Sequence, residues 1–227
     1  MGKRKWGINS GWDIPSYAER KWQPYVTAIG QAALAWNALH EGLGILFWAL
    51  NGRIAKQRPQ AIWNSTDNDV AKRKLLAAVA MTLTNNHLAL YPKMEDDLGW
   101  LLDRTNAVGK ARNDAVHSPL FIPSWREKEQ AEERGQIVGQ VYPNTDFGNP
   151  RALALANKDL LTEYRWCRDA AAVLLRFTSQ IDFCVSMNLI GGDGKLPLLV
   201  PWPDRPRMPN RGQKKRRQRR PLRSSPK

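Results

Sequence analysis

The stretch Tyr25–Leu50, "YVTAIGQAALAWNALHEGLGILFWAL", decides the fold. Drawn as a helix, it is apolar on nearly every face, which in a soluble protein is typical of a helix enclosed by other elements. A membrane span is the rival interpretation. However, His40 and Glu41 interrupt the stretch centrally, and only nine uncharged residues follow them, fewer than the roughly 20 that a span needs. We therefore predict a helix wedged in a protein core.

Three further long helices are expected downstream. The second begins at Asp67 or Asn68, both good capping residues, and runs to the break at Pro92. The third continues from there to Ser118, with three acidic residues in its first turn, where negative charge favours the helix dipole. The fourth spans about 157–190 and ends at a Gly-Gly pair.

These helices predict an all-α fold, an up-and-down bundle of four to five helices over residues 25–190. The glycines and prolines of residues 1–24 indicate an irregular N-terminal segment. An insert, 119–156, separates the last two long helices, and its stretch "QIVGQVY" fits a short hairpin. Residues 193–227, rich in Pro and then in Arg and Lys, are expected to form a flexible, disordered tail.

The positive charge is concentrated at the C-terminus. The chain carries a net charge of +14, yet 205–227 holds eleven basic and no acidic residues, so the rest carries only +3. Attraction to RNA through phosphate contacts is therefore expected mainly from this tail, although nuclear targeting and simple solubilisation also fit such a run. The predicted nucleic-acid-binding residues are Lys214, Lys215, Arg216, Arg217, Arg219 and Arg220.

The two cysteines and the N-terminus bear on the cellular compartment. Cys167 and Cys184 fall on the fourth helix about 25 Å apart, too far for a disulfide. The basic N-terminus is followed by polar residues and tryptophans rather than by the apolar run of a signal peptide. We expect a cytoplasmic protein without a membrane or lipid anchor.

The third helix ends in "KARNDAVHS", residues 110–118, which supplies the candidate site. Asn113 and His117 are four residues apart and share one helix face, while Arg112 lies about 140° around the helix from His117. The long side chain of Arg112 can nevertheless sweep back towards a common ligand. A structural interpretation fits as well, because cations near a helix C-terminus are ordinary capping residues.

These three residue types suit RNA cleavage by attack of the ribose 2′-OH on the neighbouring phosphorus. Histidine can move the protons, arginine can clamp the phosphate oxygens, and a neutral asparagine can orient either without adding charge. This route needs no cofactor or metal, and a chain with three histidines offers no histidine-rich metal site.

The stretch "RNDAVH" resembles the R-x4-6-H signature of the HEPN superfamily in its form with Asn after the arginine. The resemblance covers about residues 25–190 and implies a metal-independent endoribonuclease that acts as a homodimer, with two motifs facing across one cleft. It implies that Arg112 and His117 are catalytic and that Asn113 supports them. Members serve in toxin systems with an antitoxin or regulatory partner, in antiviral defence and in RNA processing.

Other members of that superfamily leave two alternatives open. The chain could be a catalytically inactive helical module for dimerisation and nucleic-acid binding. It could also be a subunit paired with a nucleotidyltransferase that binds nucleotide or is an antitoxin's target. The insert 119–156 departs most from a minimal bundle, so it bears directly on any substrate inferred from the family.

Glu41 is a second candidate, because it shares a helical stripe with Leu34, Ala38 and Ile45. A buried carboxylate needs a partner, and we hypothesise that Glu41 faces Arg112 and supports it. The alternative is a rotated helix with Glu41 in solvent and His40 inward.

Other chemistry-bearing residues are expected to have structural roles. His87 fits a helix end rather than a catalytic site. For the loop residues Trp125 and Trp202, two roles fit: stacking on bases, or pinning a loop to the body.

Overall fold

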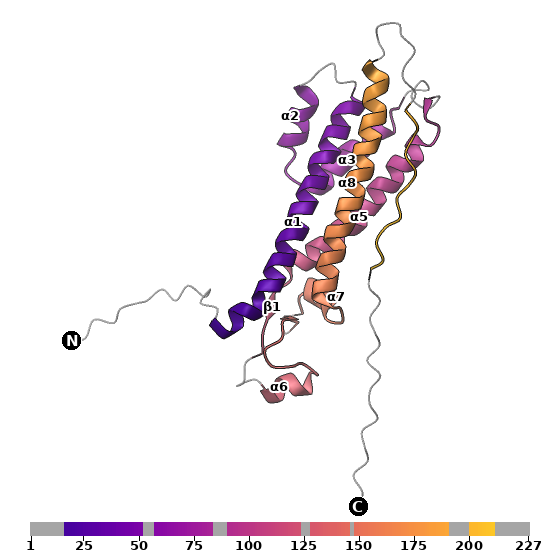
Figure 1. The fold of residues 1–227 in the computed structure, drawn as a ribbon. Coiled ribbons are helices and arrows are strands. Elements are labelled where there is room, and N and C mark those ends of the chain that lie inside the picture. Colours follow the sequence, from indigo (N-terminus) through magenta and orange to yellow (C-terminus); the bar gives the residue numbers. More distant parts are fainter. Residues whose placement is uncertain are drawn as a thin grey trace, which may run out of the picture.

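The computed structural model of the chain describes residues 16–51, 57–83, 90–123, 128–145, 148–190 and 200–211. Its described part is all-α apart from one two-stranded ladder. Four long helices form an elongated bundle (Figure 1). They are α1 (Ser16–Leu50), α3 (Asp69–Ala80), α5 (Met94–His117) and α8 (Leu160–Ile190). The all-α bundle predicted from the sequence is therefore confirmed.

Helix α1 begins nine residues earlier than predicted. Residues 16–24, expected to be irregular, are helical, and Pro24 lies inside the helix rather than before it. A proline in this position removes one i→i−4 hydrogen bond, and the exposed neighbours Lys21 and Gln23 leave the freed carbonyl open to water. The extension gains contacts, because Trp22 and Tyr25 pack against a cluster at the lower end of the bundle. Residues 1–15 lie outside the described part.

The core is built along α1 and α8, which lie side by side over most of their length (Figure 1). Trp36, Leu39, Leu43 and Leu46 of α1 are buried against α3, α5 and α8. Both cysteines are on α8 and buried, and they form no disulfide with each other, as predicted. Burial of these and the other apolar side chains of the core is the main stabilising term.

The second predicted helix, α3, is shorter than expected. Asn68 is its N-cap, as predicted, and its side chain accepts a hydrogen bond from the Ala71 amide at 2.7 Å. The helix ends at Ala80, so it does not reach Pro92, and residues 84–89, including His87, lie outside the described part. A short helix, α2 (Arg58–Ser65), was not predicted; its buried Trp63 packs on Phe47 of α1 with ring centroids 5.4 Å apart.

Helix α5 matches its prediction. Three acidic residues occupy its first turn, and Ser118 is its C-cap with extended backbone before Pro119. Asp97, in that first turn, is only 2% exposed. A carboxylate so deeply buried requires a partner, which the C-terminus supplies as described below.

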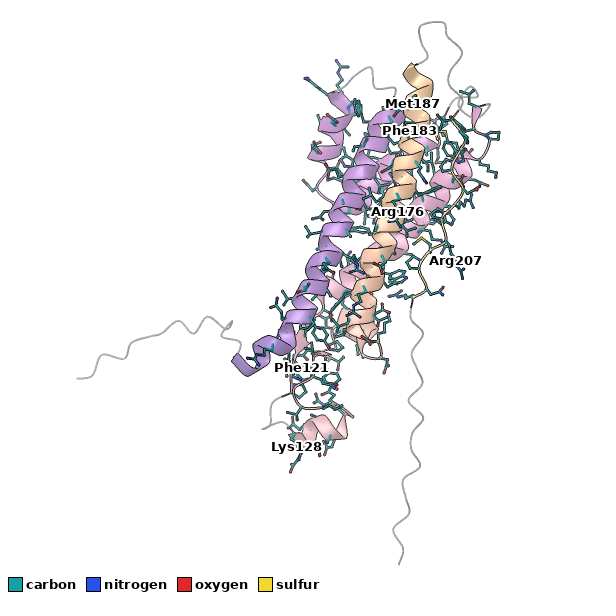
Figure 2. All side chains as sticks on the ribbon, in the orientation of Figure 1. Phe121, Lys128, Arg176, Phe183, Met187 and Arg207 are labelled. Carbon is teal, nitrogen blue, oxygen red and sulfur yellow. The ribbon has the colours of Figure 1, made fainter. Side chains whose placement is uncertain are left out.

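The insert forms a small subdomain at the lower end of the bundle. Strands β1 (Leu120–Phe121) and β2 (Tyr142–Pro143) pair antiparallel, and between them lies α6 (Lys128–Glu133). The short hairpin predicted in "QIVGQVY" is therefore wrong, because only Tyr142 of that stretch lies in a strand and its partner strand precedes α6. Helix α7 (Pro150–Leu155) follows, capped by Asn149. Phe121 and Lys128 lie at the opposite end of the molecule from Phe183 and Met187 (Figure 2).

The predicted flexible tail is wrong for residues 200–211, which we name the C-terminal strap. The strap is extended and runs beside α5 and α8 (Figure 1). Trp202 pins it to the body, since its indole nitrogen donates to Asp97 Oδ2 at 2.6 Å and its ring lies on Tyr91. This is the pinning role of the two expected for Trp202. Residues 191–199 and 212–227, like Trp125, lie outside the described part.

One described helix segment, Leu160–Met187, is long and apolar enough to cross a membrane. Half of its most apolar window is buried inside the protein. Core helices of soluble proteins pass the same test, so the segment is weak evidence for a span.

Two glycines of α5 give a test of the packing between α1 and α5. A Cβ on Gly109 would lie 2.7 Å from the Trp36 ring, whereas a Cβ on Gly99 would meet no atom within 4 Å. Gly99→Ala should raise the free energy of unfolding by about 1 kcal/mol through helix propensity. Gly109→Ala should lower it by about 1 kcal/mol, because overpacking costs about 1–3 kcal/mol and outweighs that gain. Urea unfolding measures both, and equal stabilisation by the two variants would contradict the close contact.

Candidate functional site

The motif residues occupy the last two turns of α5. His117 is the final helical residue and is exposed, and Asn113, one turn earlier, is exposed as well. His117 therefore lies at the negative end of the helix dipole. This position suits a group that donates a proton to a ligand arriving from solvent.

Arg112 is partly buried on the inward side of α5. Its neighbours Val108, Gly109 and Ala115, one turn away in either direction, are all buried. Its Nη1 donates to Asn113 Oδ1 at 3.0 Å. Its Nε is buried and has no hydrogen-bond partner within the described protein. The Nη1 of the guanidinium is therefore held by Asn113, while its Nε remains an unused donor.

Within one chain the structure does not bring Arg112 and His117 together. Arg112 shares the buried stripe of α5, whereas His117 shares the exposed stripe with Lys110 and Asn113. Among the described residues, no hydrogen bond joins the two side chains, and Asn113 accepts one from Arg112. The 140° separation expected from helix geometry thus persists in the fold.

The hypothesis that Glu41 faces Arg112 is wrong. Glu41 is exposed on α1, and the neighbouring His40 points inward with 7% of its surface accessible. Because α1 is apolar on nearly every face, its sequence did not show whether His40 or Glu41 points inward. His40, rather than Glu41, lies within electrostatic reach of Arg112, whose charge helps to lower the pKa of His40.

His40 belongs to a polar cluster formed by Trp36, His40, Asp69, Arg73 and Asn106, in which His40 and Arg73 are buried and Asp69 and Asn106 reach the surface. Arg73 donates from Nη1 to His40 Nε2 at 3.1 Å and from Nε to Asn106 Oδ1 at 2.7 Å. The Trp36 indole nitrogen donates to Asp69 Oδ2 at 2.7 Å. These hydrogen bonds tie α1, α3 and α5 together.

The protonation of His40 follows from its partners. A guanidinium has only donors, so Nε2 must accept, and the ring proton is on Nδ1, which faces Asp69 Oδ1 at 3.6 Å. Burial lowers the pKa of His40 to about 4; Asp69 opposes this, while Arg73, Lys72 and Arg112 lower it further. His40 is therefore neutral near pH 7 and is an acceptor for Arg73.

Sequence reasoning missed Asp69 and Arg73, although a signal was present. Asp69, Arg73, Leu76 and Ala80 are spaced as one helical stripe, and the last two are buried. An arginine on such a stripe indicates a buried cation. Its acceptors on two other helices could not be identified from the sequence.

A groove of about 710 Å³ lies between α3 and α5. Arg73, Lys74, Trp100 and Asn106 line it, and Arg205 of the strap contributes to its wall. Arg112, Asn113 and His117 are not among its lining residues. The groove is therefore separate from the motif.

The thiol beside the motif is not reactive. Burial raises the pKa of Cys167 to about 12; Glu163 adds to the rise, and Arg211, Lys158 and Arg112 oppose it. A neutral buried thiol is a poor nucleophile. Within the described ranges, no group of three or more His, Cys, Asp or Glu side chains is placed to hold a metal ion. The six predicted RNA-binding residues, Lys214 to Arg220, lie outside the described part.

The lowered pKa of His40 gives a pH prediction. The folded state binds fewer protons than the unfolded state between pH 6.5 and about 4, so the free energy of unfolding should fall as the pH falls through this window. The limiting slope is about 1.4 kcal/mol per pH unit. His40→Gln keeps an acceptor for Arg73 but does not titrate, and should flatten the profile between pH 5 and 6.5.

Urea unfolding at a series of pH values measures both proteins. A wild-type profile parallel to that of His40→Gln would show that His40 is not held neutral by the fold.

Comparison of the chain with models of known families, with curated proteins and with solved structures finds no match. The interpretation of the site therefore depends on its own residues and geometry.

Proposed function

We propose that this protein is a metal-independent endoribonuclease of the HEPN type, with Arg112, Asn113 and His117 as its working residues. The observation that carries the proposal is the arrangement at the end of α5. An exposed histidine lies in the last turn, and one turn earlier an arginine tethered by Asn113 at 3.0 Å keeps an unpaired Nε donor.

The proposed chemistry is transesterification within the RNA strand. The 2′ oxygen forms a bond to the neighbouring phosphorus, the bond from phosphorus to the 5′ oxygen breaks, and the products end in a 2′,3′-cyclic phosphate and a 5′-OH. His117 takes the 2′ proton or supplies the proton to the 5′ oxygen, and water exchanges the complementary proton. Arg112 donates to the non-bridging oxygens as negative charge develops on them.

The separation of Arg112 and His117 around α5 favours a site shared between two copies of the chain. Arg112 lies on the partly buried side of α5, towards α1 and α8, whereas His117 lies on the exposed side. In a symmetric dimer the His117 of one copy could meet the Arg112 of the other, since such interfaces pair each surface with its equivalent. This accounts for an arginine that is oriented but not paired with a carboxylate.

A second candidate function is a catalytically inactive helical module that binds nucleic acid. The inward position of Arg112 favours it, because a partly buried arginine can serve only to cover the apolar side of its own helix. In that case "KARNDAVHS" is a helix end, and the basic C-terminus alone attracts RNA. For the active enzyme, but not for the inactive module, we propose a role in a toxin system or in antiviral defence. Neighbouring genes that encode an antitoxin or defence proteins would support that role.

The test is a time course of the purified protein on mixed RNA in EDTA, with product ends examined for 2′,3′-cyclic phosphate. His117→Ala should reduce the cleavage rate about 10²–10⁴-fold and Arg112→Ala about 10²–10³-fold. Arg176→Ala removes an exposed arginine of α8 (Figure 2) and should cut like the wild type. Circular dichroism checks that each variant is folded.

Intact RNA with the wild type, or equal cutting by all variants, would exclude the enzyme and leave the binding module. A mixture of the two inactive variants then tests the shared site. Random pairing of His117→Ala and Arg112→Ala subunits should restore about a quarter of wild-type activity, because half the dimers carry one intact composite site. A mixture that stays inactive would show that each chain needs both residues.

A further inference from the structure

Arg73 of α3 is a buried cation whose hydrogen-bond partners are neutral. Only 7% of the residue is exposed. Its Nη1 donates to the neutral ring of His40, and its Nε donates to the amide oxygen of Asn106. Of the five donor hydrogens of a guanidinium, two are thus used and three remain, two on Nη2 and one on Nη1.

No carboxylate of the described residues forms an ion pair with this guanidinium. Burial lowers the pKa of Arg73, and the nearby charge of Asp69 opposes this. The oxygens of Asp69 lie on other groups, Oδ2 at 2.7 Å from the Trp36 indole nitrogen and Oδ1 at 3.6 Å from His40 Nδ1. A buried charge without a counter-ion in contact is costly, because the water that it has lost is not replaced by an opposite charge. An anion bound beside Arg73 would supply that charge.

The groove between α3 and α5 gives a ligand access to Arg73. Arg73 lines this groove of about 710 Å³ although it is buried, and the exposed Lys74 lies next to it. Arg205, which also lines the groove, is already paired with Asp97. Among the described residues of the wall, Arg73 and Lys74 are therefore the cations that remain for a ligand.

The rest of the groove suits a flat apolar group. Small and apolar side chains from both helices line it, together with one indole: Ala77, Ala80, Gly99, Leu102 and Trp100. A Cβ on Gly99 would meet no atom within 4 Å, so the absence of a side chain there keeps the groove open. Sites for small molecules have volumes of about 300–1,000 Å³ and are mostly apolar with a few polar groups, as this groove is.

Acidic residues of α5 limit the charge that the groove accepts. Glu95, Asp96 and Asp103 line it together with the cations of α3. These acids would repel a strand of nucleic acid or a ligand with several negative charges. A single carboxylate avoids most of this repulsion, and its two oxygens match the paired donors of a guanidinium. The charges of the groove therefore favour a carboxylate over a phosphate.

We propose that the groove between α3 and α5 binds a small carboxylate with a flat apolar body, and that Arg73 holds the carboxylate group. Lys74 adds attraction from the rim, and the body lies over Gly99. His40 and Asn106 hold the guanidinium in place before the ligand arrives, which reduces the entropy lost on binding. The motif residues of α5 do not line the groove, so this proposal does not depend on the proposed ribonuclease.

The first experiment compares three ligands that share one aromatic body. Naphthalene-2-carboxylate is the probe, the neutral naphthalene-2-carboxamide is its control, and 2-naphthyl phosphate carries the higher charge. Isothermal titration calorimetry with the full chain should give a Kd of about 1 mM or lower for the carboxylate. The carboxamide should bind about tenfold more weakly or worse, since it lacks the charge-assisted hydrogen bonds. No binding of the carboxylate, equal binding of the carboxamide, or tighter binding of the phosphate would overturn the proposal.

A matched pair of glycine substitutions tests the location. Gly99 and Gly30 are both exposed helical glycines at which a Cβ would meet no atom within 4 Å, and Gly30 is on α1 outside the groove. Both leucine variants should fold, because glycine is the poorer helix former. Gly99→Leu fills the groove and should weaken carboxylate binding about tenfold or more, whereas Gly30→Leu should change it by less than about twofold. Equal effects would place the carboxylate elsewhere on the protein.

The cations are tested in the same titration. Lys74→Gln should weaken binding about threefold, whereas Lys110→Gln, which removes an exposed lysine of α5 outside the groove, should leave it unchanged. Arg73→Lys keeps the charge but loses the paired donors, and should weaken binding about tenfold. Circular dichroism checks that this variant is folded, and if it is not, the glycine pair decides. Equal losses at the two lysines would mean that the carboxylate responds only to the net charge of the protein, which would contradict the proposal.

Discussion

The indole of Trp36 joins three of the four long helices, and the position of the motif depends on it. Its ring lies against Gly109 of α5, where only a hydrogen atom fits, and its nitrogen is held by Asp69 of α3. The Arg73 guanidinium lies 5.5 Å from the ring centroid. One side chain of α1 therefore sets the rotation of α5, because a ring fixed at both its face and its nitrogen leaves the facing helix little freedom.

That rotation of α5 explains why Arg112 is partly buried while His117 is exposed. Arg112 follows Gly109 by three residues, so it lies on the same side of α5 and turns towards α1 and α8. His117 is 140° further round and reaches solvent. The polar cluster around His40 places a neutral ring, rather than a carboxylate, within electrostatic reach of Arg112. Among the described residues, the hydrogen-bond partner of the Arg112 side chain is the neutral Asn113 and not a carboxylate.

The sequence was most informative where a single helix determines the outcome. Local signals, which do not depend on tertiary contacts, predicted the all-α bundle, the Asn68 cap, the acidic start of α5 and its end at Ser118. The rotation of α1 was not predictable, since apolar residues on every face give no preferred side. Neither were the partners of Asp97 and Glu163, which are separated from Arg205 and Arg211 by 108 and 48 residues.

The strap shows why composition misled at the C-terminus. A segment rich in proline and arginine cannot build a core of its own, and this is the basis on which such segments are predicted to be disordered. Here the body supplies what the segment lacks: two buried carboxylates and two aromatic faces, those of Tyr91 and Trp166, at a spacing that an extended chain can follow. Arg205 and Arg211 fix the architecture by pairing with these carboxylates, a role that composition alone cannot distinguish from the binding of phosphates.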